Sequence, residues 1–158
     1  MKRLIWLVLI FTVLYPILGE EPPLTKDQAD AKALVEKAAV LIQGSGEEAL
    51  AKVSDPEGGF YLKDRAIYVF VYDSECVVLA HPVKNSLIGM SLKGKPDARG
   101  KKFRDEIVKK AIEDGDGWTT YSYQKPGEKG IHPKIAYGKL AEHEGKQFIV
   151  VAGVYYTN

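Results

Sequence analysis

Residues 67–82 read IYVFVYDSECVVLAHP, and this stretch decides the fold. Two runs rich in β-branched and aromatic residues flank a short polar turn, DSE at 73–75, and this pattern predicts a β-hairpin. Proline cannot donate to a sheet ladder, so we expect the second strand to end at His81-Pro82. The histidine then lies at the mouth of a loop. A titratable imidazole at the exit of a buried hairpin is a candidate ligand contact.

The segments around the hairpin predict helices on both sides of it in the chain. Apolar residues recur at helical spacing from 29 to 43, with Thr25 as the expected N-cap and the GSG at 44–46 as the stop. A short helix is expected over 47–53. A second amphipathic helix is expected over 103–113, after a long polar loop of the kind that forms lids and binding loops.

Three further strands are expected after that helix. They cover residues 118–123, 134–140 and 148–155. This order predicts an α+β fold. It consists of a five-stranded antiparallel sheet with the long N-terminal helix on one face and a helix inserted after the second strand.

Period-two alternation divides the first strand of the hairpin into two different faces. One face carries Tyr68, Phe70 and Tyr72, and the opposite face carries Ile67, Val69 and Val71. We expect the aliphatic face to pack against the N-terminal helix. The aromatic face is then covered by the polar loop at 85–102 and the helix that follows it.

The N-terminus has the pattern of an export signal. Lys2 and Arg3 precede an apolar run to Leu18, and Gly19 is the expected cleavage position. The run is shorter than the ~20 residues of a spanning helix, although an uncleaved membrane anchor is the alternative. We therefore expect a signal peptide or anchor at 1–19, a linker and helix start at 20–28 and one domain at 29–158. Either reading of the N-terminus makes the domain periplasmic or otherwise extracytoplasmic.

Composition bounds the classes of function. The chain has 158 residues and a formal net charge of +1, which fits one ordinary globular domain and gives no electrostatic footprint of a nucleic-acid binder. Cys76 is the only cysteine, so the domain has no internal disulfide. Its stability must come from burial.

The sequence gives little support to an enzyme. His81, His132 and His143 show no metal-ligand spacing, and no nucleophile motif, phosphate-cradling loop or cysteine–histidine pair is present. We therefore expect no catalytic residue, no metal and no cofactor.

A binding role has better support, because polar and aromatic side chains lie where strands meet loops. Alternation places Tyr121 and Tyr123 on one face of their strand, where the ring can pack and the hydroxyl can donate. Lys134 at the start of the next strand can supply a cation for a carboxylate. The alternatives stay open here: such tyrosines are also typical of a core, and an edge lysine is often solvated.

The ordered motifs resemble the single Cache domain family. They are YVFVYD at 68–73, VVLAHP at 77–82, N-x-x-x-G at 85–89, G-W-x-x-Y at 117–121, P-K-x-x-Y at 133–137 and VAGVY at 151–155. The resemblance covers 29–156. It implies a PAS-like sheet of the kind found in extracytoplasmic sensor modules of chemoreceptors and histidine kinases, with a pocket for small organic anions on the face opposite the N-terminal helix.

Carried over residue by residue, the family's pocket positions fall on five side chains. They are His81, Trp118, Tyr121, Lys134 and Tyr137. Trp118 and Tyr121 point to opposite faces of a regular strand, as do Lys134 and Tyr137. We rank His81, Tyr121 and Lys134 first.

The sequence thus predicts an exported sensor-type domain that binds a short-chain carboxylate. Receptors of this family continue into signalling domains, whereas this sequence ends at Asn158, so we expect no signalling output of its own. The alternative is an accessory protein with a vestigial pocket that docks on a membrane kinase, receptor or cytochrome. The expected partners are a small carboxylate and, in the alternative, a membrane sensor, with no nucleic acid.

Overall fold

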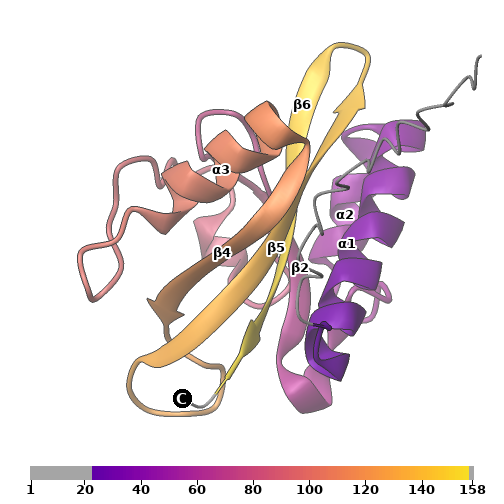
Figure 1. The fold of residues 1–158 in the computed structure, drawn as a ribbon. Coiled ribbons are helices and arrows are strands. Elements are labelled where there is room, and N and C mark those ends of the chain that lie inside the picture. The colour runs from indigo at the N-terminus through magenta and orange to yellow at the C-terminus, as the bar shows by residue number, and fades with distance from the viewer. Residues whose placement is uncertain (1–22, 157–158) are drawn as a thin grey trace, which may run out of the picture.

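The computed structural model describes residues 23–156 and shows one antiparallel sheet with helices on both faces (Figure 1). The elements are α1 (Lys26–Ser45), α2 (Glu48–Ser54), β1 (Tyr61–Leu62), β2 (Ile67–Tyr72), β3 (Val78–Ala80), α3 (Phe103–Asp114), β4 (Asp116–Tyr123), β5 (His132–His143) and β6 (Lys146–Tyr155). The predicted signal peptide or anchor at 1–19 lies outside the described residues. Within 23–156, no helix is both long and apolar enough to cross a bilayer.

The predicted hairpin is present as β2 and β3. The two strands pair antiparallel with a bulge at Val71 and Tyr72. Asp73 holds the turn, because its carboxylate accepts hydrogen bonds from the backbone N–H groups of Glu75 and Val77, both at 2.8 Å. As expected, β3 ends directly before His81.

The sheet has one more strand than the sequence predicts. Its order is β1-β2-β6-β5-β4, and β3 pairs with β2. β1 and β3 share one edge of β2, since β1 pairs with its start and β3 with its end. A strand of two residues is too short to leave an alternation pattern, which is why β1 was not predicted.

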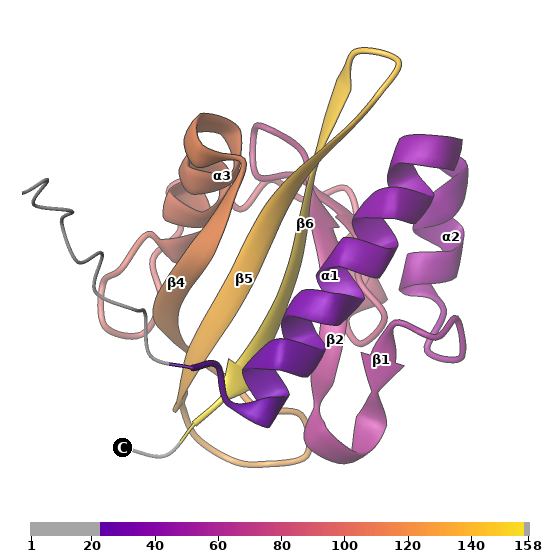
Figure 2. The same ribbon diagram turned by 45° about the vertical axis from the view of Figure 1, so that its right-hand side comes forward.

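The capping and packing of α1 follow the sequence closely. Thr25 and Gln28 form a capping box, in which each side chain accepts a hydrogen bond from the other residue's backbone N–H. The helix lies across the sheet with α2 beside it (Figure 2). Its buried side, which includes Val35, Ala38 and Ile42, packs on the aliphatic face of β2 as predicted.

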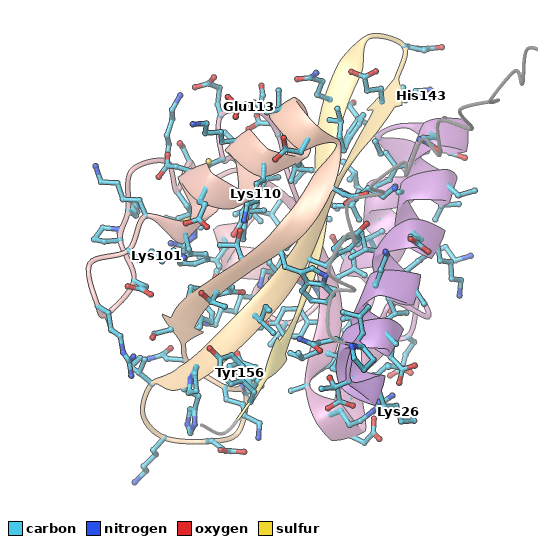
Figure 3. All side chains as sticks on the ribbon, viewed as in Figure 1. Lys26, Lys101, Lys110, Glu113, His143 and Tyr156 are labelled. Carbon is cyan, nitrogen blue, oxygen red and sulfur yellow. The ribbon has the colours of Figure 1, made fainter. Side chains whose placement is uncertain are left out.

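The β5–β6 hairpin reaches past the body of the sheet to the end of α1. His143, labelled at the tip in Figure 3, makes a 2.8 Å contact from its Nδ1 to the carbonyl of Gln43. Beside it, Lys146 pairs with Glu47 at 2.9 Å. The hairpin therefore satisfies a carbonyl that the last turn of α1 leaves free.

The opposite face of the sheet is covered by α3 and the loop at 85–102, again as predicted (Figure 1). Gly138 permits close approach of the helix, because a Cβ there would lie 2.9 Å from a methyl group of Ile107. The loop is more ordered than its composition suggests. Ser91 bridges Val77, so part of the loop runs as an irregular extra strand beside β3.

Substitutions of two valines on α1, one buried and one exposed, test how this helix packs on the sheet. Val35 is 0% exposed and Val40 is 69% exposed. Val35→Ala removes buried methyl groups, and we expect it to lower the free energy of unfolding by about 1–3 kcal/mol in urea titrations. The matched control Val40→Ala is expected to change it by less than about 0.5 kcal/mol. Equal effects of the two substitutions would contradict this docking of α1.

Candidate functional site

A narrow cavity lies between the sheet and α3, on the aromatic face of β2, and we call it the slot. It is lined by Tyr68, Phe70, Tyr72, Val78, His81, Leu87, Leu92, Phe103, Arg104, Tyr121, Tyr123 and Lys134. The slot as it stands has a volume of about 20 Å³. This is the room of a single water molecule, so anything larger enters only if the lining moves.

The Lys134 side chain extends from β5 across the face of the neighbouring strand β6. It passes over Gly153, where a Cβ atom would lie only 2.8 Å from the Lys134 Cε. The ammonium lies 3.4 Å from the hydroxyl oxygens of both Tyr68 and Tyr155. It is also 4.5 Å from the centroids of both rings, which gives two cation–π contacts.

The Lys134 ammonium is buried without an opposite charge. The side chain is 1% exposed, and its polar partners in the described part of the chain are the two tyrosine hydroxyls. Burial lowers the pKa of Lys134 to about 7, and the positive charge of Lys84 acts in the same direction. An anion in the slot would supply the missing charge.

His81 lies in the slot as a neutral hydrogen-bond donor. Its Nδ1 accepts from the backbone N–H groups of Val83 at 3.2 Å and Lys84 at 3.0 Å. This arrangement requires Nδ1 to be unprotonated and leaves the proton on Nε2. Burial, together with the charges of Lys134 and Lys84, lowers the pKa of His81 to about 4.

Tyr121 is the third predicted side chain that the structure places in the slot. It is 6% exposed, and its ring stacks on Phe103 with centroids 3.9 Å apart and an interplanar angle of 4°. Burial raises the pKa of the hydroxyl well above its ordinary value, so it remains a donor. The structure thus brings His81, Tyr121 and Lys134 together.

Trp118 and Tyr137 do not join them. They are register partners on β4 and β5, with ring centroids 5.2 Å apart, and they pack on the α1 side of the sheet. The pairing of β4 with β5 is continuous, without the bulge that would bring opposite parities to one face. Assigning these two positions to the same pocket is therefore wrong, and they belong to the other core.

Arg104 also lines the slot, although the sequence does not predict it as a site residue. It is the second residue of α3 and is 8% exposed, and its Nη1 donates to the Lys95 carbonyl at 3.3 Å. Its Nε is buried with no partner among the described residues. The guanidinium stacks over Phe103 at 4.1 Å. An arginine is usually exposed, and the helical spacing of α3 does not mark this one as buried, so no sequence signal distinguishes it.

The loop at 85–102 closes the slot and is held by two carboxylates. Asp97 accepts hydrogen bonds from the backbone N–H groups of Arg99, Lys101 and Ser122 at 2.8–2.9 Å. Asp105 on α3 accepts from the Gly94 N–H. Access to the slot therefore depends on polar contacts at the loop ends and on the pairing with β3.

Larger hollows on the outside of the molecule are weaker candidates. One of about 680 Å³ lies where α1 begins and β6 ends, near Lys26 and Tyr156 in Figure 3. Charged groups along it are already paired, as Lys26 with Asp30 and Lys125 with Glu128. Within 23–156, no cluster of three or more His, Cys, Asp or Glu side chains is arranged to hold a metal ion.

An antiparallel sheet with a polar and aromatic slot on one face defines a PAS-like ligand-binding module. Residues 23–158 match the family described as "Single Cache domain 2", and the chain belongs to this family, as the sequence predicts. The family consists of sensor modules that bind ligands and are not enzymes.

Solved structures with the same fold include a periplasmic sensor domain and a chemosensory domain. A periplasmic sensor domain of a chemotaxis protein is 29% identical, with a TM-score of 0.67 over 82% of this chain and 95% of that one. A Cache chemosensory domain, described as showing the structural basis for carboxylic acid recognition, is 22% identical, with a TM-score of 0.67 over 82% and 93%. A methyl-accepting chemotaxis protein from Vibrio parahaemolyticus is 21% identical, with a TM-score of 0.66 over 81% and 87%.

The buried ammonium of Lys134 leads to a testable dependence of stability on pH. Lys134 titrates near 10.5 when unfolded and at about 7 when folded. Between these values the unfolded chain binds more protons, so the free energy of unfolding rises with pH. We expect this rise in urea titrations from pH 7 to about pH 8, below the range in which the Cys76 thiol and the tyrosines of the unfolded chain titrate.

Lys134→Met should flatten the rise, because it removes the group responsible. The matched control Lys129→Met removes an exposed lysine and should keep the slope of the unaltered protein. Equal slopes in the unaltered protein and Lys134→Met would show that Lys134 stays charged in the fold.

Proposed function

We propose that this chain is an exported sensor-type domain that binds a small organic anion, such as a short-chain carboxylate, in the slot. The observation that carries this proposal is the Lys134 ammonium, which is buried without an opposite charge in the described residues. An isolated buried charge is costly, and a carboxylate would offset that cost.

Two neutral donors support the same ligand class. The Nε2–H of His81 and the hydroxyl of Tyr121 both belong to side chains that line the slot. A carboxylate has two acceptor oxygens, so it can accept from the ammonium and from these donors together. The solved Cache chemosensory domain described for carboxylic acid recognition adds support from a protein of the same fold.

We infer binding rather than catalysis from the state of the candidate reactive groups. The Nδ1 of His81 is occupied by two backbone N–H groups, so the imidazole is a poor general base. Burial raises the pKa of the Cys76 thiol to about 11, which disfavours the thiolate.

The export part of the proposal rests on residues 1–19 and on the periplasmic sensor domain of similar fold. Mass spectrometry of the protein from cells would test it. Loss of the first 19 residues is the expected result with a cleaved signal. An intact N-terminus in the membrane fraction indicates the anchor instead.

The volume of the slot favours a second candidate function. At about 20 Å³ it has room for one water, which suits an accessory protein whose pocket no longer binds and which docks on a membrane kinase, receptor or cytochrome. The two candidates differ in whether any small acid binds to the purified protein.

Calorimetry with the purified protein and C2–C4 acids decides between them. We expect one or more acids to bind, and Lys134→Met to weaken the affinity by about 10-fold to 100-fold, since a charge-assisted contact contributes about 1.5–3 kcal/mol. The control Lys129→Met removes a nearby exposed lysine and should leave affinity within about twofold. Absence of binding by every acid would favour the accessory protein.

Binding should also take up protons at mildly alkaline pH. With a pKa of about 7, most Lys134 is neutral at pH 8, and a bound carboxylate favours the ammonium. We expect uptake approaching one proton per acid bound, measured by calorimetry at pH 8 in buffers of different ionisation enthalpy. Above pH 7 the affinity should fall by up to about tenfold per pH unit.

Lys134→Met provides the control for this measurement. Its binding heat should not vary with the buffer, because it has no amine to protonate. Uptake that persists in this variant would assign the proton to another group.

A further inference from the structure

The slot contains a second buried cation in addition to Lys134. Arg104 reaches it from α3, whereas Lys134 reaches it from β5. Both side chains are more than nine-tenths buried, and neither forms an ion pair with a carboxylate of the described residues. Lysine can lose its proton to relieve burial, but arginine remains charged. Arg104 therefore favours an anionic ligand at any physiological pH.

The two cations lie at different ends of the slot. Tyr68, Phe70 and Tyr72 follow one another on one face of β2, and the outer two are separated by about 13 Å at the rise of a strand. The Lys134 ammonium is 4.5 Å from the Tyr68 ring. Arg104 is beside Tyr72, where it opposes the upward shift that burial causes in the tyrosine pKa.

Tyr123 limits how far apart the two charges are. The guanidinium carbon of Arg104 and the ammonium of Lys134 are each 5.9 Å from the centroid of this ring. Their separation is therefore at most twice that distance. Most of the other residues that line the slot are aromatic or aliphatic, so the two cations share it with an apolar wall.

We propose that the slot selects a small α,ω-dicarboxylate with a backbone of about four carbons. One carboxylate would pair with Lys134 and the Nε2–H of His81, and the other with Arg104, while the carbon chain packs on Phe70 and Tyr121. This inference rests on the proposed function, since it specifies the ligand class for the same slot.

The length of such a ligand fits the two charges. The end carbons of an extended four-carbon chain are about 4 Å apart, from C–C bonds of about 1.5 Å. Adding a charge-assisted contact of about 2.8 Å at each end gives a span of roughly 10 Å between the cations. This falls within the limit that Tyr123 sets. The slot, at about 20 Å³, must widen to admit the carbon chain.

Electrostatics favours two carboxylates over one. A monocarboxylate compensates one buried cation and leaves the other beside an apolar ligand tail, whereas a dicarboxylate compensates both. The guanidinium can also bind a carboxylate with two parallel hydrogen bonds. Its contact to the Lys95 carbonyl is long at 3.3 Å, so little is lost when it is exchanged for a carboxylate.

Calorimetry with succinate and butyrate on the purified full chain tests the proposal. The two acids have the same number of carbons and differ in the second carboxylate. We expect succinate to bind at least tenfold more tightly than butyrate, and more tightly than malonate, which is too short. Binding of butyrate as tight as that of succinate would overturn the proposal.

Variants of Arg104 test whether this residue binds the second carboxylate of the ligand. Arg104→Met should weaken succinate at least tenfold and leave butyrate within about threefold, so that the preference for the diacid is lost. The control Arg99→Met removes an exposed arginine from the same loop region and should change neither affinity. Equal weakening of both acids would overturn the role of Arg104 in selecting the diacid.

A second variant, Arg104→Lys, keeps the test valid if Arg104→Met does not fold. It keeps the charge but not the paired hydrogen bonds, and should weaken succinate while preserving its advantage over butyrate. If butyrate binds and succinate does not, the dicarboxylate inference is wrong while the proposed function stands. If no acid binds, both are wrong.

Discussion

Burial of both faces of β2 is the constraint on which the rest of this structure depends. All six residues of the strand are buried, with aliphatic side chains toward α1 and aromatic side chains toward α3. Because the two faces have different chemistry, the sheet separates a purely structural core from one that contains charged and hydroxyl groups. The slot lies in the second core, between the sheet, α3 and the loop at 85–102.

The two cores suggest how stability and binding are divided in this domain. The α1 side contains no buried ion among its core residues and supplies packing. The α3 side holds Lys134 and Arg104 in an apolar environment, which lowers the stability of the protein without a ligand. A ligand that compensates these charges, as we propose, would stabilise the folded state.

The sequence predicts the fold, and it predicts that three side chains lie together in the slot, for identifiable reasons. The alternation in β2 and the proline after His81 define the hairpin, and parity along β4 and β5 places Tyr121 and Lys134 on the aromatic face. Grouping Trp118 and Tyr137 with them followed the spacing of family motifs rather than parity, and parity prevails because the strands are regular. Arg104 could not be predicted, since its burial arises from the loop folding over the first turn of α3.

The position of the Lys134 side chain depends on the absence of a Cβ atom at Gly153. The Lys134 side chain crosses this strand where a Cβ would lie only 2.8 Å from its Cε and 3.0 Å from the Ile135 carbonyl oxygen. A methyl group at this position would therefore clash with the lysine side chain and displace it from its place between Tyr68 and Tyr155. A relative with alanine here would have to place its lysine elsewhere, and so would separate the Cache scaffold from the anion recognition that we propose.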